Sequence, residues 1–234
     1  MKKYRTMVGD KFRGLANQLG LRCTWPHSFA QEGEDLILSR FFGEKKGGFY
    51  VDVGAHHPVR YSNTYLFYLR GWQGVNVDAM PGSMEPFRRL RPRDQNIEAA
   101  VSNSQRSLTY FAFNDPAMNT CDPNIARQRD GLEHYRVIET RTIQPESLGA
   151  LLRNHLAPGQ HVDFLSVDVE GLDLDVLTSN DWQRFRPTVI LTEDFGIGTI
   201  ENVLKSDISV FLSKHGYRLF AKTVNTLFFE KMGS

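Results

Sequence analysis

Two aspartates at the ends of predicted strands have the spacing that most suggests chemistry. Asp52 lies near the end of the apolar strand 49–53 and is followed by Gly54, and Asp78 lies at the end of the next predicted strand, 74–79. A strand, a glycine turn, a helix and a second strand ending in an acid, about 20 residues on, is how a doubly wound sheet binds an adenosine-bearing cofactor. We therefore predict that Asp52, Gly54 and Asp78 bind such a cofactor, with the acid accepting hydrogen bonds from ribose hydroxyls.

The turn after Asp52 distinguishes two kinds of cofactor. It reads Gly-Ala-His-His-Pro-Val-Arg over residues 54–60, so a single glycine is followed by bulky side chains. A nicotinamide or flavin dinucleotide carries a pyrophosphate, which needs a glycine-rich loop that lets backbone N–H groups approach. S-adenosylmethionine has no phosphate, and its sulfonium and amino groups favour carboxylates. The turn favours this methyl donor, with Ser62, Asn63 and Thr64 near its amino-acid end; a tight turn without any ligand is the alternative.

Small residues near the end of the third predicted strand, 97–101, leave room for a flat ring. Ala99 and Ala100 lie there, and the turn 78–81, which includes Ala79, follows the preceding strand. We predict that adenine lies between these two segments. Ordinary close packing of alanine explains the same residues equally well.

Carboxylates gather after two further predicted strands, in the segments 162–171 and 188–194. Neighbouring acids repel one another unless a positive charge lies among them, and three such oxygens suit Mg²⁺. The arrangement resembles metal-dependent O-methyltransferases of the catechol type, and that resemblance implies Asp168, Glu193 and Asp194 as metal ligands. In the alternative without a metal, Asp168 faces the ammonium group of the donor.

Three residues are candidates for a general base. Glu170 follows Asp168 in the same strand end, and His56 and His57 lie in the cofactor turn. Methyl transfer from a sulfonium needs only a deprotonated oxygen placed in line with the methyl group, so one suitably placed base suffices. A histidine at a surface turn often has no such role.

The composition excludes several classes of protein. Of 234 residues, 28 are Lys or Arg and 27 are Asp or Glu, so no overall charge attracts nucleic acid or anionic lipid. The two cysteines, Cys23 and Cys121, do not form a disulfide framework and fit a reducing compartment. No segment has the roughly 20 apolar residues of a membrane span, and none reads as a signal peptide. We expect a soluble, cytoplasmic protein.

The order of the elements predicts how these residues are positioned. After a peripheral arm, 1–28, strand and helix patterns alternate through a single domain, 29–234, as a parallel sheet requires. The seven strands expected in the main sheet are 49–53, 74–79, 97–101, 162–171, 188–194, 217–223 and 226–230. The last two form an antiparallel hairpin around a two-residue link. We predict an α/β fold with a doubly wound, mostly parallel, Rossmann-like sheet.

The segment 103–144 interrupts this alternation. Two further strand patterns, 107–113 and 136–144, enclose a polar loop, 114–123, and a short charged helix. Loops of this length inside a compact domain are often functional. We therefore predict that 103–144 forms a substrate-facing cap.

The motifs together resemble the FkbM family of methyltransferases. The matching stretches, which span about residues 28 to 231, are 29–35, 48–58, 62–64, 71–74, 78–82 and 163–171. The resemblance implies a class I methyltransferase fold, S-adenosylmethionine as the donor, and transfer to a hydroxyl of a sugar, polyketide or other metabolite. It also implies that Gln31, Glu34 and Asp35 lie near the donor.

We therefore expect an O-methyltransferase whose acceptor is a small molecule or a glycan, most plausibly a saccharide hydroxyl, and whose oligomeric state is open. One alternative is an NAD-dependent nucleotide-sugar dehydrogenase or epimerase, but the glycine-rich turn and the tyrosine–lysine pair of that class have no convincing counterpart here. A non-catalytic Rossmann-like binding module is the other alternative, and the acids at the strand ends argue against it.

Overall fold

The computed structural model describes residues 27–195 and 199–233, so nearly all of the predicted arm 1–28 lies outside the described part. A seven-stranded sheet with the order β3-β2-β1-β6-β7-β9-β8 forms its centre. The strands are β1 (Phe49–Val53), β2 (Gln73–Asp78), β3 (Gln95–Glu98), β6 (Phe164–Val167), β7 (Val189–Glu193), β8 (Tyr217–Lys222) and β9 (Thr226–Lys231). The first five run parallel, and β9 pairs antiparallel with both β7 and β8. The predicted fold class and its C-terminal hairpin are confirmed.

The central strands are buried on both faces, which explains why they read as continuous apolar runs. Every residue of β1 and β6 is buried. Because side chains alternate along a strand, Val51 packs into one core layer and Tyr50 into the other.

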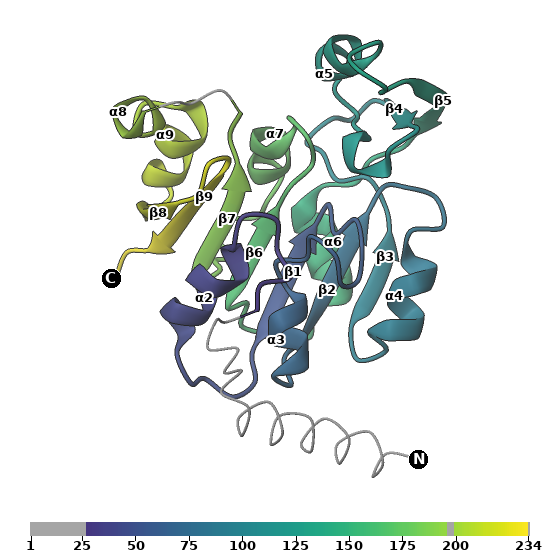
Figure 1. Ribbon diagram of the computed structural model, residues 1–234. Coiled ribbons are helices and arrows are strands. Elements are labelled where there is room, and N and C mark those ends of the chain that lie inside the picture. Colours follow the sequence, from purple (N-terminus) through teal and green to yellow (C-terminus); the bar gives the residue numbers. More distant parts are fainter. Residues whose placement is uncertain (1–26, 196–198, 234) are drawn as a thin grey trace, which may run out of the picture.

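Helices cover both faces of the sheet (Figure 1). On one face, α6 (Leu148–His155) and α7 (Asp173–Thr178) contribute Leu151 and Leu177 to the core. On the other, α2 (Glu34–Phe42) and α3 (Tyr65–Leu69) contribute Leu38 and Phe67. The remaining helices of the main domain are α4 (Met84–Leu90), α8 (Ile200–Val203) and α9 (Asp207–Lys214). This two-sided covering is the doubly wound arrangement.

Several element boundaries differ from those predicted. The helical spacing of apolar residues over 29–42 predicts a helix there, but α2 begins at Glu34. Asp35 accepts hydrogen bonds from Ser28 Oγ (2.7 Å) and Phe29 N (2.8 Å) and holds 28–33 as a loop. The sequence likewise predicts a single helix over about 200–215, but this segment is divided into α8 and α9, since Ser206 caps α9.

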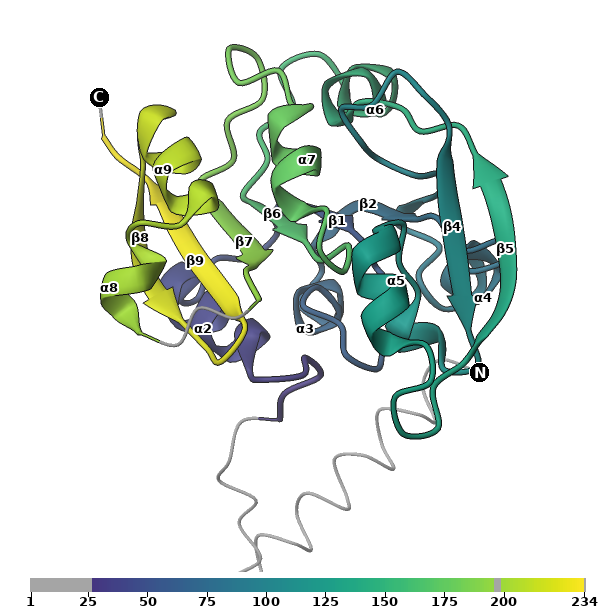
Figure 2. The same ribbon diagram turned by 90° about the horizontal axis from the view of Figure 1, so that it is seen from above.

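The inserted segment forms a separate two-stranded sheet beyond the carboxyl ends of the central strands (Figures 1 and 2). Its strands β4 (Leu108–Phe113) and β5 (Val137–Ile143) pair antiparallel. Between them lie a short 3₁₀ helix, η1 (Pro116–Met118), and α5 (Pro123–Arg129). The segment thus lies over the edge of the sheet where the predicted acids end their strands. Within the described residues, no helix is both long and apolar enough to cross a membrane.

Candidate functional site

A cavity of about 370 Å³ opens at the carboxyl ends of the parallel strands, beneath the inserted segment. Its volume is in the range of small-molecule and cofactor sites. Ten of the predicted site residues line it: Gln31, Gly54, His56, Asp78, Ala79, Ala99, Ala100, Asp168, Glu170 and Glu193. Residues more than 160 positions apart in the sequence therefore meet in one pocket.

Gly54 allows the ends of β1 and β6 to approach each other closely. Its φ is +86°, and a Cβ atom added there would lie 1.7 Å from the carbonyl oxygen of Asp168. A side chain at this position would push the two strand ends apart. The glycine predicted to make the cofactor turn thus also places Asp168 beside it.

Asp78 lies at the floor of the cavity, where β2 ends. One carboxylate oxygen accepts a hydrogen bond from the backbone N–H of His56 and the other accepts one from that of Met80, each at 2.8 Å. These bonds fix the carboxylate in one orientation, and each oxygen keeps a second lone pair for a ligand hydroxyl. Burial raises its pKa, and the two N–H bonds oppose that rise. This geometry suits the predicted contact with a ribose.

Small residues line the cavity where β2 and β3 end. Ala79, Ala99 and Ala100 all border it. Met80 also lines the cavity, and its sulfur accepts a hydrogen bond from Asn119 of the inserted segment (3.5 Å). The residues predicted to flank adenine therefore border the same cavity as Asp78, next to the inserted segment.

Three acids meet at the other end of the cavity: Asp168, Glu170 and Glu193. One oxygen of each lies within 4.8 Å of the others. Glu170 has φ = 55°, an uncommon left-handed conformation for a residue with a side chain, which turns the chain sharply just after β6. The predicted set of ligands contained Asp194 in place of Glu170.

Asp194 does not join this group, so that part of the predicted metal site is not formed. Side chains point alternately to the two faces of a strand. Glu193, the last residue of β7, points toward the cavity, so the side chain of the next residue, Asp194, points away from it. Asp194 lies next to α9, where its Oδ2 atom is buried without a hydrogen-bond partner.

Burial raises the pKa of every acid in the cluster, and repulsion between acids adds to this rise for Asp168 and Glu193. Burial raises the pKa of Glu193 to about 8, assisted by Glu170 and Asp173, and burial followed by Glu193 and Glu170 raises that of Asp168 well above its usual range. The pKa of Glu170 is also raised by burial, but the Arg129 guanidinium opposes this rise. A cation bound among the three acids would favour their ionised forms.

Arg129 connects the inserted segment with the acid cluster. Its Nη2 atom lies 2.5 Å from Glu170 Oε2, and its Nη1 atom donates to the carbonyl oxygen of Met118 at 3.1 Å. Thr120 adds a second link to the cluster by donating to the backbone carbonyl of Glu170 at 2.9 Å. Among the described residues that line the cavity, Arg129 is the only arginine or lysine.

The two histidines of the turn have different surroundings. His57 does not line the cavity; its Nδ1 atom accepts hydrogen bonds from the N–H groups of Val59 and Arg60, so it holds the turn together. His56 lines the cavity, has φ = 49°, and its Nε2 atom is buried without a partner. Burial lowers the pKa of both rings, so both are neutral near pH 7. Of the two, only His56 is placed to contact a ligand.

Asp52, predicted to bind the cofactor, is buried below the turn and does not line the cavity. It accepts a hydrogen bond from Thr64 Oγ1 at 2.9 Å. Asn63, the residue before Thr64, donates a hydrogen bond to Ser166 Oγ at 3.1 Å. Asn63 and Glu34 instead border a small adjoining space of about 10 Å³, enough for one water molecule.

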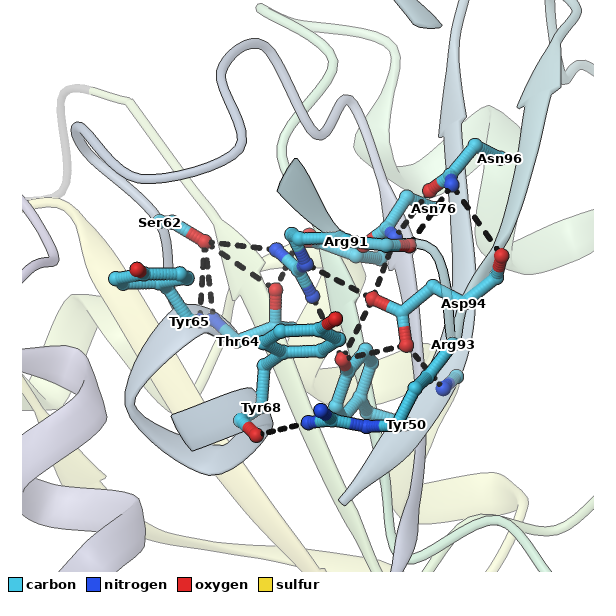
Figure 3. A network of polar contacts seen from close by, with 12 residues as sticks. Tyr50, Ser62, Thr64, Tyr65, Tyr68, Asn76, Arg91, Arg93, Asp94 and Asn96 are labelled. Atoms are coloured by element: carbon cyan, nitrogen blue, oxygen red, sulfur yellow. Dashed lines mark hydrogen bonds and ion pairs between the residues drawn. The ribbon is translucent and has the colours of Figure 1, made fainter. Parts of the chain in front are cut away.

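A buried polar network supports this turn from below (Figure 3). Arg91 is fully buried, and its guanidinium bonds to Asp94 (2.8 Å) and to the hydroxyl of Tyr50 (2.7 Å). Its Nη1 atom also lies 3.4 Å from Ser62 Oγ. The charge of Arg91 is thus compensated inside the core. The network joins the turn that carries Asn63 to β1 and to the loop before β3.

Several side chains that line the cavity were not predicted as site residues, among them Tyr61, Asp115, Arg129 and Phe195. Asp115 lies in the predicted polar loop and Arg129 in the short charged helix, so the predicted cap pointed to their region. Tyr61 and Phe195 carry no signal in the sequence, because a lone aromatic residue in a loop is compatible with many environments.

One family of known proteins matches the sequence. The family model described as "Methyltransferase FkbM domain" matches residues 52–219, more than two thirds of the chain. No curated protein matches the sequence.

Several solved structures resemble the fold. A TehB-like SAM-dependent methyltransferase from Corynebacterium glutamicum is 11% identical over 99% of this chain and 100% of its own, with a TM-score of 0.41. An O-methyltransferase from Bacillus cereus in complex with SAH is 11% identical over 94% and 90%, with a TM-score of 0.41. The MycE methyltransferase of mycinamycin biosynthesis, in complex with Mg and SAH, is 15% identical over 84% and 45%, with a TM-score of 0.42. At these TM-scores, assignment to a family rests on the sequence match alone.

Proposed function

Because this chain belongs to the FkbM family of methyltransferases, we propose that it transfers a methyl group to a hydroxyl of a saccharide or related metabolite. The family establishes the enzyme class and S-adenosylmethionine as the methyl donor; the acceptor is the proposal. The observation that carries it is the convergence of Asp168, Glu170 and Glu193 at one end of a cavity with Asp78 at the other.

The cavity residues fit the donor from end to end. Asp78 would accept hydrogen bonds from the ribose, and Ala79 and Ala100 would flank the adenine ring. The sulfonium and ammonium groups would lie toward the acids, because Asp168, Glu170 and Glu193 gather at this part of the cavity wall. Gln31, at the junction of the cavity and the small adjoining space, is placed for the amino-acid end.

The donor, when bound, supplies an electrophilic methyl group on a positively charged sulfur. The protein must then orient an acceptor hydroxyl in line with that group and take its proton. We propose Glu170 as the general base that accepts this proton. Arg129 favours the ionised form of Glu170, and Glu170, with its left-handed backbone, lines the cavity. His56 is the second candidate, since its Nε2 atom has no partner.

The acid cluster also fits a divalent ion. Adjacent and opposite oxygens around Mg²⁺ are about 3.0 and 4.2 Å apart for metal–oxygen distances near 2.1 Å, so three oxygens within 4.8 Å of one another would need to draw together only slightly to bind the ion. Asp168, Glu170 and Glu193 would hold the ion. Its charge would relieve their repulsion and lower the pKa of an acceptor hydroxyl.

We also propose a cytoplasmic location, because a chain with two cysteines has no disulfide framework and fits a reducing compartment.

Two measurements test the proposed function. Calorimetry should show binding of S-adenosylmethionine and none of NAD; binding of NAD alone would favour a dehydrogenase or epimerase. Transfer of a radioactive methyl group should then be measured over a panel of saccharides and of non-sugar alcohols and phenols. We expect methylation of at least one saccharide, and methylation of phenols alone would refute the saccharide assignment.

A further inference from the structure

Two partly exposed aromatic residues border the acid end of the cavity. Tyr61 is 48% exposed and Phe195 is 41% exposed, yet both line the cavity. Tyr61 also borders the small adjoining space, as Asp168 and Glu193 do, so this residue lies near the acid cluster. Exposed aromatic rings at the edge of a polar pocket are typical of sites that bind a partly apolar surface.

The backbone conformation of Tyr61 is strained. Its φ is 56°, in the left-handed region that bulky residues rarely adopt. His56, in the same loop and also left-handed, lies nearly parallel to it, with ring centroids 6.4 Å apart and an interplanar angle of 18°. Strained residues of this kind cluster at ligand sites, where the surrounding structure holds them.

The charges in the cavity limit what the acceptor can carry. Asp78, Asp115, Asp168, Glu170 and Glu193 line it. The single arginine among the described lining residues, Arg129, is already paired with Glu170 and bonded to Met118. Among the described residues that line the cavity, an acceptor with a carboxylate or phosphate near the reacting hydroxyl would therefore meet several acids and no uncommitted arginine or lysine.

Resting on the proposed function, we infer that the acceptor is an electrically neutral saccharide ring that packs against Tyr61 and Phe195. A pyranose ring has a face of C–H groups, which suits an aromatic surface, and a perimeter of hydroxyls, which suits carboxylates. With the ring at this border, one hydroxyl reaches the acids while the others stay near water. Sugar acids and sugar phosphates modified close to that hydroxyl are excluded by repulsion.

The test compares matched neutral and anionic sugars. Methyl glucoside, galactoside and mannoside should be assayed against the corresponding methyl uronosides, with methyl transfer and saturation-transfer NMR as readouts. We expect kcat/KM for a neutral sugar to exceed that for its uronoside at least tenfold. Equal or faster methylation of the uronosides would overturn the inference about charge.

The aromatic contact is tested by substitution. Tyr61→Ala and Phe195→Ala should each raise KM for the neutral sugar about three- to tenfold, while the dissociation constant of S-adenosylhomocysteine stays within twofold. Tyr61→Trp should restore most of the affinity, and Phe41→Ala, which removes an exposed ring from α2 away from the cavity, should change nothing. An unchanged KM in both alanine variants, or a loss confined to cofactor affinity, would refute the aromatic contact.

The two proposals fail in different ways. If the wild-type protein binds the cofactor but neither binds nor methylates any saccharide, the saccharide assignment itself falls, and this inference with it. If it methylates saccharides, but kcat/KM does not depend on their charge and KM does not change in the two alanine variants, the proposed function stands and only this inference fails.

Discussion

The guanidinium of Arg129 and the carboxylate of Glu170 form an ion pair that joins α5 of the inserted segment to the turn after β6. Nη2 and Oε2 are 2.5 Å apart, and both side chains are largely buried, with 17% and 21% of their surfaces exposed. The inserted segment thus does more than cover the cavity: it supplies the positive charge that opposes protonation of the proposed base.

Replacing Arg129 by Met should lower kcat about tenfold or more, since an uncompensated buried carboxylate takes up a proton. The pKa of Glu170 should rise, so the acidic limb of the pH–rate profile should move to higher pH. Arg129→Lys should recover part of the loss. Arg127→Met on the same helix is the matched control, because Arg127 hydrogen-bonds to Pro123 and Asn124 of its own helix and does not line the cavity. An unshifted acidic limb in Arg129→Met would argue against Glu170 as the base.

Replacing Asp78 by Ala should weaken binding of S-adenosylhomocysteine about tenfold or more, because two ribose hydroxyls would lose a charged acceptor. Calorimetry measures this directly. Thermal unfolding shows how much of the effect is structural, since Asp78 also accepts two backbone bonds. Glu98→Ala at the end of β3 serves as control, as Glu98 accepts one backbone bond, from Gly82, and does not line the cavity. Wild-type affinity in Asp78→Ala would show that the ribose binds elsewhere.

Glu193→Gln and Asp194→Asn separate the two possible sets of metal ligands. Glu193 lies in the acid cluster and Asp194 does not, so only Glu193→Gln should weaken Mg²⁺ binding measured by calorimetry, by about tenfold. Chelation followed by readdition of Mg²⁺ should remove and restore methyl transfer in the wild type. If chelation leaves the rate of methyl transfer unchanged, the three acids act without a metal ion, by accepting and releasing protons.

The pH dependence of stability should report the burial of Asp52. Burial raises its pKa to about 6, against 3.8 for an ordinary aspartate, so the folded state holds this proton more tightly than the unfolded state does. The resulting stabilisation is complete below about pH 4 and is lost as the pH rises through 6, a change of roughly 3 kcal/mol.

Asp52→Asn should lack that contribution, so the difference in unfolding free energy between wild type and variant should fall by about that amount from pH 4 to pH 7. Denaturant titrations at a series of pH values measure it, and the other buried acids cancel because both proteins carry them. A constant difference would contradict the assigned pKa. Cofactor affinity should change little, since Asp52 lies behind Thr64 and outside the cavity.

Much of the architecture was predictable because strands that are buried on both faces appear in the sequence as continuous runs of apolar residues. β1 matches its predicted bounds, and β2 and β7 differ from theirs by one residue at each end. The helix boundaries were less predictable, since they depend on capping by particular side chains such as Ser206 and on the bonds that Asp35 makes to the preceding loop. The predicted end of β3 was wrong because Val101 forms only an isolated bridge, with Glu146.

The sequence by itself determined that several strands would end in acids at one edge of a sheet, because alternating strand and helix patterns imply parallel strands whose carboxyl ends share that edge. Only the tertiary structure decided which acids meet. Glu170 joins the cluster through a left-handed backbone turn, Asp194 is directed away by strand alternation, and Asp52 is covered by Thr64. Arg129 reaches Glu170 from a helix 41 positions earlier. Such contacts depend on packing between segments distant in sequence, which no local pattern records.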